Sequence, residues 1–195
     1  MGGTFDPIHM GHLVCAEQAR DALDLDGVIF MPAGNPVFKK HIEVSDAHHR
    51  VAMCRAAIED NPAFDVSTLE VDRAGDTYTV DTLETLRAHY PENVELYFIA
   101  GADAILTLPQ WRDAPRLARL ASFVGLNRPR SASLQSPQIA KKLAGTGFRT
   151  LFVEAPLFEL SSSDIRKRIL GNRSVRYLIP PAVLEYIESV GLYGD

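Results

Sequence analysis

Two short segments near opposite ends of the chain combine residue types that suit the binding of phosphate groups. The first, residues 1–12, reads MGGTFDPIHMGH and contains two glycines, a turn and two histidines three residues apart. Gly2 and Gly3 allow backbone amides to approach an anion closely, because a glycine has no Cβ. His9 and His12 can donate N–H groups to an oxygen that gains negative charge in a phosphoryl-type transition state. Free amides at the start of the helix expected over residues 13–25 would add the positive end of its dipole.

Other interpretations of the two histidines stay open at this point. Either histidine alone is also typical of a helix cap or a surface position. The pair could instead supply two ligands of a zinc site, but such a site needs three or four. The nearest further candidates, His41, His48, His49 and Cys15, do not have the spacing of a zinc motif.

The second segment, residues 160–166, reads LSSSDIR. Ser161, Ser162 and Ser163 stand directly before an apolar helical pattern, where N-cap residues are found. Arg166 brings positive charge to the start of this helix, which the helix dipole disfavours unless an anion is held there. Because arginine binds phosphate through two N–H donors, the segment predicts the second half of a triphosphate site. A plain capped helix is the alternative.

Short apolar strands alternate with helical patterns along the rest of the chain. Strands are expected over residues 28–31, 64–71, 95–100, 122–126 and 150–153, and helices after Ser45, over 79–90 and from Pro181 onward. This alternation predicts an α/β, Rossmann-like fold: a doubly wound, mainly parallel sheet with helices on both faces. Ligands bind beyond the carboxyl ends of such strands. The turns at residues 2–3, 32–34 and 101–103 are therefore expected to meet there.

The composition limits the class of protein. The length suits one domain, residues 1–195, with a small helical part from about residue 161. A formal net charge of −5 argues against a general nucleic-acid binder. Cys15 and Cys54 are expected to be reduced thiols of a cytoplasmic protein. The sequence has neither a signal peptide nor an apolar run that could span a membrane, and any homo-oligomer would not be a coiled coil.

The two segments together resemble the signatures of the H-x-G-H nucleotidyltransferase superfamily, and the whole chain resembles its bacterial nicotinate-nucleotide adenylyltransferases. The resemblance rests on landmarks that follow one another in order along the chain. They are GGTFDPIH at 2–9, MP at 31–32, Pro36 with Lys39, HR at 49–50, GDTYTVDTL at 75–83, IAGAD at 99–103, Trp111, RP at 128–129, SSSDIR at 161–166, YLIP at 177–180 and GLY at 191–193.

The resemblance implies transfer of an adenylyl group from ATP to nicotinate mononucleotide, with release of pyrophosphate. It implies four catalytic residues: His9 and His12 at the α- and β-phosphates, and Lys39 and Arg166 at the β- and γ-phosphates. Magnesium would be carried by the ATP phosphates rather than by protein ligands. The implied ATP-binding residues are Gly2, Gly3, Thr4, Phe5, His9, His12, Gly101, Asp103, Ser162, Ser163 and Arg166.

The acceptor nucleotide would meet a second group of residues. The resemblance implies that Lys39, Tyr78, Thr79 and Trp111 bind it, with the Trp111 ring stacked on the pyridine. A core position is the default for a tryptophan and stays open. Free amides beside Thr79 suit a carboxylate, so nicotinate is favoured over nicotinamide.

Two departures from the family pattern carry expectations of their own. Relatives have a complete apolar strand before the Gly-Gly turn, whereas only Met1 precedes Gly2 here. We expect that the sequence starts at an internal methionine and that added upstream residues raise thermal stability; the alternative is a fold with a gap at that place. Position 38 is Phe where many relatives have His, so no role is carried over to Phe38. Asp6 is equally well explained as a turn residue before Pro7.

Several other functions remain as alternatives. A phosphopantetheine adenylyltransferase usually has Thr in place of His9 and lacks the segment at 75–79. A nicotinamide mononucleotide enzyme comes next, and a cytidylyltransferase has a different terminal signature. A non-catalytic nucleotide sensor on the same fold is the alternative from another class, although both histidines, Lys39 and Arg166 are present.

Overall fold

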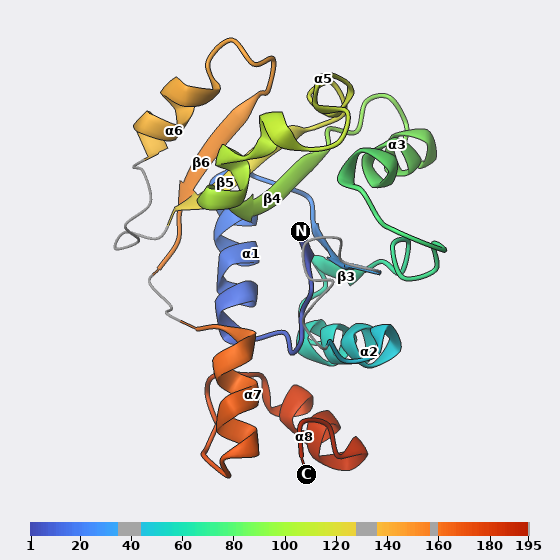
Figure 1. Ribbon diagram of the computed structural model, residues 1–195, viewed down its shortest axis with the longest axis vertical. Helices are drawn as coiled ribbons and strands as arrows, with labels where there is room; N and C mark the ends of the chain where they lie inside the picture. The colour runs from blue at the N-terminus through green and yellow to red at the C-terminus, as the bar shows by residue number, and fades with distance from the viewer. Residues whose placement is uncertain (35–43, 128–135, 157–159, 195) are drawn as a thin grey trace.

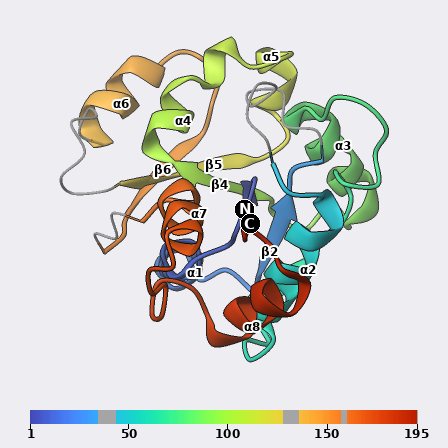
Figure 2. The ribbon, with the colours of Figure 1, turned by 60° about the horizontal axis from the view of Figure 1, so that its bottom comes forward.

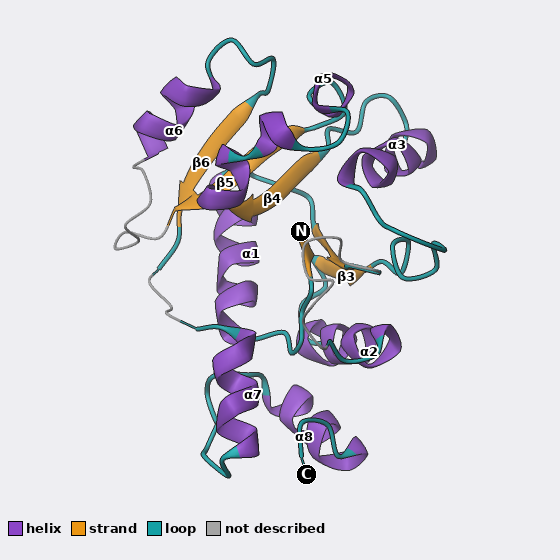
Figure 3. Ribbon diagram, viewed as in Figure 1, coloured by secondary structure: helices purple, strands orange, loops and turns teal. Residues whose placement is uncertain are grey.

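The computed structural model of the protein describes residues 1–34, 44–127, 136–156 and 160–194. Its strands pair in parallel and form two three-stranded sheets, β1-β2-β3 and β4-β5-β6 (Figures 1 and 3). The strands are β1 (Gly2–Gly3), β2 (Val28–Pro32), β3 (Phe64–Val66), β4 (Tyr97–Gly101), β5 (Ser122–Asn127) and β6 (Thr150–Glu154).

Helices cover both faces of the second sheet and one face of the first. Figure 2 shows α4 and α6 on one side of β4-β5-β6 and α1 on the other. Helix α2 packs on β2 and β3, and α8 packs on α2. The helices are α1 (Met10–Ala22), α2 (Ala47–Ile58), α3 (Thr79–His89), α4 (Ala102–Leu106), α5 (Ala114–Leu117), α6 (Ser136–Leu143), α7 (Ser162–Leu170) and α8 (Pro181–Val190), with a 3-10 turn η2 (Leu108–Gln110).

The predicted α/β class is confirmed, but the described strands form two sheets rather than one. Strand β1 bonds to β2 at Gly2↔Met31 and Gly3↔Pro32 and ends there. It touches β4 without sharing a sheet with it among the described residues. Set edge to edge with β1 beside β4, the two sheets have the order 3-2-1-4-5-6 of a doubly wound fold. The break between them therefore follows from the two-residue length of β1.

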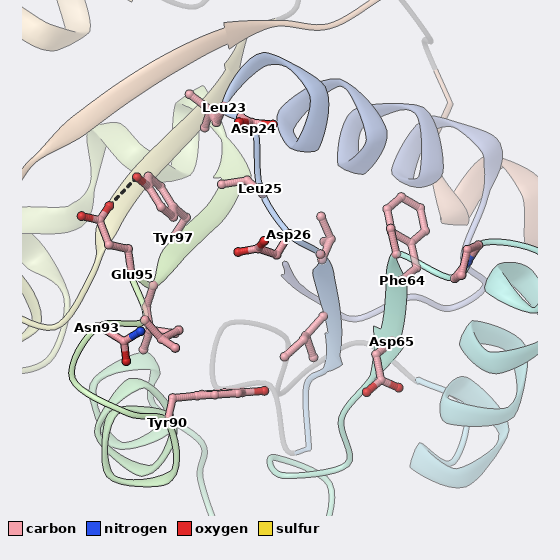
Figure 4. A pocket seen from close by; sticks show the side chains of 17 residues that line it. Leu23, Asp24, Leu25, Asp26, Phe64, Asp65, Tyr90, Asn93, Glu95 and Tyr97 are labelled. Atoms are coloured by element: carbon pink, nitrogen blue, oxygen red, sulfur yellow. Dashed lines mark hydrogen bonds between the residues drawn. The ribbon is translucent and has the colours of Figure 1, made fainter.

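A groove of about 700 Å³ lies where the two sheets separate (Figure 4). The start of β2, with Val28 and Ile29, forms one wall, and Leu96 with Tyr97 at the start of β4 forms the other. The Met1 amine donates to the Ile29 carbonyl oxygen at 2.7 Å, and burial lowers its pKa to about 5. The groove is at the amino ends of the strands, on the edge opposite the carboxyl ends where ligands of this fold bind.

Two local predictions were wrong for identifiable reasons. The strand expected over 64–71 ends at Val66, because a turn follows: the Asp72 amide donates to the Thr68 carbonyl oxygen at 2.8 Å, and the Thr68 hydroxyl donates to the Asp72 carboxylate. The cap of α2 is Asp46, whose side chain accepts from the backbone of the first turn, and not Ser45. Local hydrogen bonds therefore determine where β3 ends and where α2 begins.

The buried apolar residues that the structure describes form two clusters. The division does not follow the two sheets: one apolar cluster joins α1, α2, α7 and α8 to Phe30 of β2 and also to Ile99, Val124 and Val153 of the second sheet, while another surrounds Ile105, Leu117 and Phe123. Cys15 and Cys54 are not joined in a disulfide, and burial raises the pKa of Cys54 to about 12. Among the described residues, no helix is long and apolar enough to cross a membrane.

Candidate active site

In the loop after β1, the Phe5 ring packs closely against the backbone of Gly3. A Cβ at Gly3 would lie 2.7 Å from the Phe5 ring, so only glycine is accommodated there. Phe5 has a φ of 50° and is buried at 2% exposure, and Thr4 is partly buried beside it. Gly2 is exposed, and a Cβ there would make only ordinary contact with the Phe98 ring. Of the two glycines, Gly3 is thus the one that the loop geometry requires.

The two predicted histidines lie face to face at the start of α1. Their rings stack with centroids 3.6 Å apart, and His9 is the N-cap of the helix. His9 is buried at 3% exposure, whereas His12 is partly exposed above it. The His12 Nδ1 accepts a hydrogen bond from the His9 backbone N–H at 3.2 Å. A neutral His12 ring therefore carries its proton on Nε2, where it can be donated to a ligand.

The serine cluster caps α7 and also ties it to the first loop. Ser161 is the N-cap, and its hydroxyl accepts from the Asp164 amide at 3.1 Å. The Ser162 hydroxyl donates to the Pro7 carbonyl oxygen at 2.9 Å, across 155 residues of sequence. The cap that the sequence predicted is therefore present, and Ser162 makes a further contact that local sequence did not indicate.

Arg166 makes the second link between the same two segments. Its NH1 group donates to the Asp6 carbonyl oxygen at 2.5 Å and lies 3.5 Å from the Asp6 carboxylate. Its NH2 group reaches the Ser163 hydroxyl at 3.5 Å. The side chain remains 22% exposed, so Arg166 is partly open to solvent although its NH1 group is held at Asp6. A planar group held in this way suits an anion.

Arg50 is a buried cation that holds the loops of the first half together. The side chain is 2% exposed and donates to three backbone carbonyl oxygens: Ser45 at 3.0 Å, Thr4 at 2.9 Å and Gly34 at 3.3 Å. Burial lowers the pKa of Arg50, and the Asp6 carboxylate acts in the opposite direction. The loop after β1 and the loop after β2 are therefore positioned by one guanidinium.

Two further predicted ATP-binding residues lie at the end of β4. Gly101 is the last residue of this strand and the N-cap of α4, and Asp103 is in the first turn of that helix. Both are exposed. Since β1 and β4 are neighbouring parallel strands, Gly101 and the loop after Gly3 lie at the carboxyl ends of adjacent strands.

The residues predicted to meet the acceptor base are on α3 and beside η2. Tyr78 is the N-cap of α3 and Thr79 its first residue, and the Arg112 guanidinium lies 4.2 Å above the Tyr78 ring. The Trp111 indole packs edge-on against Phe98 at 5.7 Å and donates to the Thr107 hydroxyl at 2.9 Å. Trp111 is only partly buried, so the ring has both a core contact and accessible surface.

Lys39 lies outside the described residues, as does the loop around it. Among the residues that the structure describes, no three His, Cys, Asp or Glu side chains gather to hold a metal ion. The donors near the first loop are instead imidazole, guanidinium and backbone amide groups, which suit an anion.

Sequence reasoning assigned no function to two residues that the structure brings to the site. Arg50 and Tyr193 both belong to the landmark segments, but a lone arginine within a helix and a tyrosine near the chain end carry no local signal. For Asp6 the sequence left a turn role and a role at the site equally open, and the structure shows that its carboxylate is buried at 3% exposure and accepts from the Tyr193 hydroxyl at 2.6 Å. These contacts join residues that are 46 to 187 positions apart.

The structure is an α/β protein in which the loop after β1 is joined to the start of α7, and known proteins resemble it in sequence and in fold. The pattern of the cytidylyltransferase-like family matches residues 1–168, which contain both predicted phosphate-binding segments. A Corynebacterium jeikeium protein named "Probable nicotinate-nucleotide adenylyltransferase" is 46% identical over 198 residues, which cover 99% of this chain and 98% of that protein. A Moorella thermoacetica protein of the same name is 46% identical over 194 residues, which cover 99% and 89%.

Solved structures agree on the fold. The nicotinic acid mononucleotide adenylyltransferase of Plasmodium falciparum, complexed with NaAD, superposes with a TM-score of 0.78 at 21% identity, covering 98% of this chain and 94% of that chain. The same enzyme complexed with APC gives a TM-score of 0.77 at 22% identity, with the same coverage of both chains. The chain therefore belongs to the cytidylyltransferase-like family and, within it, to the nicotinate-nucleotide adenylyltransferases.

Proposed function

We propose that this protein transfers the adenylyl group of ATP to nicotinate mononucleotide, which yields the deamido dinucleotide and pyrophosphate in NAD biosynthesis. The observation that carries the proposal is the junction of the two phosphate-type segments. Arg166 and Ser162 of α7 bond to the backbone of Asp6 and Pro7, so imidazole and guanidinium donors are held on one connected piece of structure. The names of the relatives agree with this chemistry.

The reaction requires placement and charge stabilisation rather than a protein nucleophile. A phosphate oxygen of nicotinate mononucleotide attacks the α-phosphorus of ATP. The bond from that phosphorus to the bridging oxygen of the β-phosphate breaks, and pyrophosphate leaves with the electron pair. Donors fixed around the phosphates lower the barrier because they stabilise the charge that builds on the equatorial and leaving oxygens.

We assign His12 and Arg166 from their partial exposure and their contacts, and His9 and Lys39 from the resemblance to the family. His12 donates its Nε2 proton to an α-phosphate oxygen, since its Nδ1 already accepts from the His9 amide. His9, stacked beneath, serves the neighbouring α- or β-phosphate oxygen and fixes the His12 ring. Arg166 and Lys39 hold the β- and γ-phosphates. Further ATP contacts come from the backbone of residues 2–5 and from Gly101, Asp103, Ser162 and Ser163.

A magnesium ion fits this donor set only as a partner of the phosphates. Asp6 is buried and already accepts from other groups, whereas Asp103 is exposed and can reach an outer-shell water. When bound, the ion would neutralise charge on the departing pyrophosphate. The chain's own residues then orient the triphosphate around it.

The acceptor base is proposed to lie between Trp111 and the start of α3. The accessible face of Trp111 can stack on the pyridine ring. The free amides at the start of α3, beside Tyr78 and Thr79, suit the nicotinate carboxylate. Nicotinamide would need an acceptor as well as donors, so the acid is the preferred substrate.

We place the reaction in the cytoplasm, where the thiols of Cys15 and Cys54 would remain reduced. The partners proposed are the two nucleotides alone. A homo-oligomer is compatible with this function and is not required by it.

Pyrophosphate release with ATP and magnesium tests the proposal, with nicotinate mononucleotide, nicotinamide mononucleotide and phosphopantetheine compared as acceptors. We expect release that strongly favours the first. Preference for the second or third acceptor would replace the substrate assignment, and ATP binding without release for any acceptor would favour a nucleotide sensor.

A further inference from the structure

The Asp6 carboxylate is a buried group that the reaction above does not use. It is 3% exposed, and such a group must be compensated by hydrogen bonds or opposite charge. The Tyr193 hydroxyl donates to Oδ1 at 2.6 Å, and the Ser45 amide donates to Oδ2 at 3.3 Å. Arg166 NH1 lies 3.5 Å from Oδ2. Three segments distant in sequence thus converge on one carboxylate of the phosphate-binding loop.

The end of the chain is shaped to deliver Tyr193 to this place. Helix α8 ends at Val190, and Gly191 then takes a left-handed conformation with a φ of 67°. The Leu192 amide donates to the Ile187 carbonyl oxygen at 3.0 Å, which closes the helix and turns the chain back. Burial, followed by the bond to Asp6, raises the pKa of Tyr193 far above its usual range. Its hydroxyl therefore keeps its proton and remains a donor to Asp6.

The hydrogen bonds that the Asp6 carboxylate accepts affect how closely the Arg166 guanidinium approaches it. A carboxylate that lacks donors draws a guanidinium into a close, two-bonded pair. Here the contact between Arg166 and the carboxylate is long, at 3.5 Å, and other groups supply donors to the carboxylate: the Tyr193 hydroxyl at Oδ1 and the Ser45 amide at Oδ2. The exposed side of the guanidinium consequently stays available to an anion.

We propose that Tyr193 is a positioning residue for the phosphate site: through Asp6 it keeps Arg166 directed at the triphosphate of ATP. The C-terminal segment thereby contributes to catalysis without touching a substrate. The inference rests on the proposed function in one respect, the meeting of Arg166 with the ATP phosphates.

Calorimetric titration with ATP in the absence of any acceptor measures this effect without turnover. In Tyr193→Phe, Asp6 loses a donor and pulls Arg166 toward itself, so the Kd for ATP should rise about tenfold. The matched control is Tyr186→Phe. This variant loses the 2.8 Å bond between His49 and the hydroxyl of Tyr186, a residue of α8, and keeps the bond from Tyr193 to Asp6. It should bind ATP within about twofold of the parent protein. All titrations are made well below the melting temperatures of the variants.

A double variant separates positioning from general loosening of the fold. If Tyr193 acts through Arg166, then Tyr193→Phe should add nothing to the loss caused by Arg166→Ala. Equal Kd values for Tyr193→Phe and Tyr186→Phe, or losses that simply add in the double variant, would overturn the inference. If Tyr193→Phe raises the Kd for ATP as expected but the parent protein transfers no adenylyl group to nicotinate mononucleotide, the proposed function is refuted and this inference stands. A parent protein that binds no ATP would refute both.

Discussion

The two halves of the molecule hold their parts of the site in different ways. In the first half, the loop after β1 is fixed by buried charged and polar groups: Arg50 bonds to three carbonyl oxygens, and Asp6 accepts from Tyr193. In the second half, the residues proposed to meet the base are partly exposed. Trp111 rests against one aromatic ring, and Arg112 lies over Tyr78.

The difference corresponds to what each half has to recognise. Charge that develops on phosphate oxygens is stabilised only by donors that do not have to reorganise, and a buried network provides that rigidity. A flat pyridine ring is recognised by area and stacking, which tolerate small movements. The phosphate side should therefore be sensitive to single polar changes, and the base side much less so.

Arg50 should show the largest effect. Arg50→Met removes the donor from three buried carbonyl oxygens and leaves Asp6 with less positive charge nearby. The free energy of unfolding should fall by about 3–5 kcal/mol. Denaturant titration measures it, with Arg55→Met on the exposed face of the same helix as control. Equal stability of the two variants would contradict a rigid phosphate side.

His12 comes next and concerns turnover rather than stability. His12→Ala removes one donor to the transition state, so kcat should fall by about 10²–10³-fold with little change in melting temperature. Steady-state pyrophosphate release gives the number. His89→Ala, at an exposed position of α3, is the control and should keep full activity. An unchanged kcat in His12→Ala would remove His12 from the mechanism.

Met1 allows a test of the region where the sheets β1-β2-β3 and β4-β5-β6 separate. Its amine has a pKa of about 5 in the fold, against 8.0 ordinarily, so the unfolded chain binds more protons between these values. Stability of the chain that begins at Met1 should therefore rise from pH 5 to pH 8, by about 2 kcal/mol once the partial exposure of Met1 is allowed for. Melting temperatures across this pH range provide the measurement.

Two extended variants sharpen the same test. Five Gly and Ser residues placed before Met1 replace the amine with an amide and should abolish the pH dependence. Five Val and Ile residues should do the same and also raise the melting temperature, because they can pair in the groove between β2 and β4 and bury apolar surface. No gain for the apolar extension over the polar one would mean that the groove does not accept a strand.

Trp111 should give the smallest effect. Trp111→Ala should raise the KM for nicotinate mononucleotide by roughly 3- to 10-fold and leave the KM for ATP unchanged, since ring stacking contributes about 0.5–1.5 kcal/mol. Trp111→Phe keeps a ring and should recover most of the loss. A variant that only melts earlier, with both KM values unchanged, would assign Trp111 to the core.

Much of the design could be predicted from the sequence because it depends on local rules. The apolar run at 28–31 gave β2, the hydroxyl at position 161 gave the cap of α7, and Pro181 opens α8. Gly2 and Gly3 were both predicted for the approach of an anion, and the structure adds a steric reason at Gly3 alone, the close Phe5 ring. In each case the neighbouring residues contain the whole cause: periodicity, capping or a clash.

Only the tertiary structure decided which buried polar groups meet. Neither Asp6 with Tyr193 nor Arg50 with Thr4 and Gly34 has a local signature, since the partners lie far apart in sequence and meet only after the helices have packed. The short first strand, by contrast, was visible in the sequence, since only Met1 precedes Gly2, and the structure shows the groove that it leaves beside β4. The sequence by itself determined the kinds of donor available for phosphate chemistry. Long-range packing determined their positions, because the burial of a charge is compensated by whichever partners the fold brings within reach.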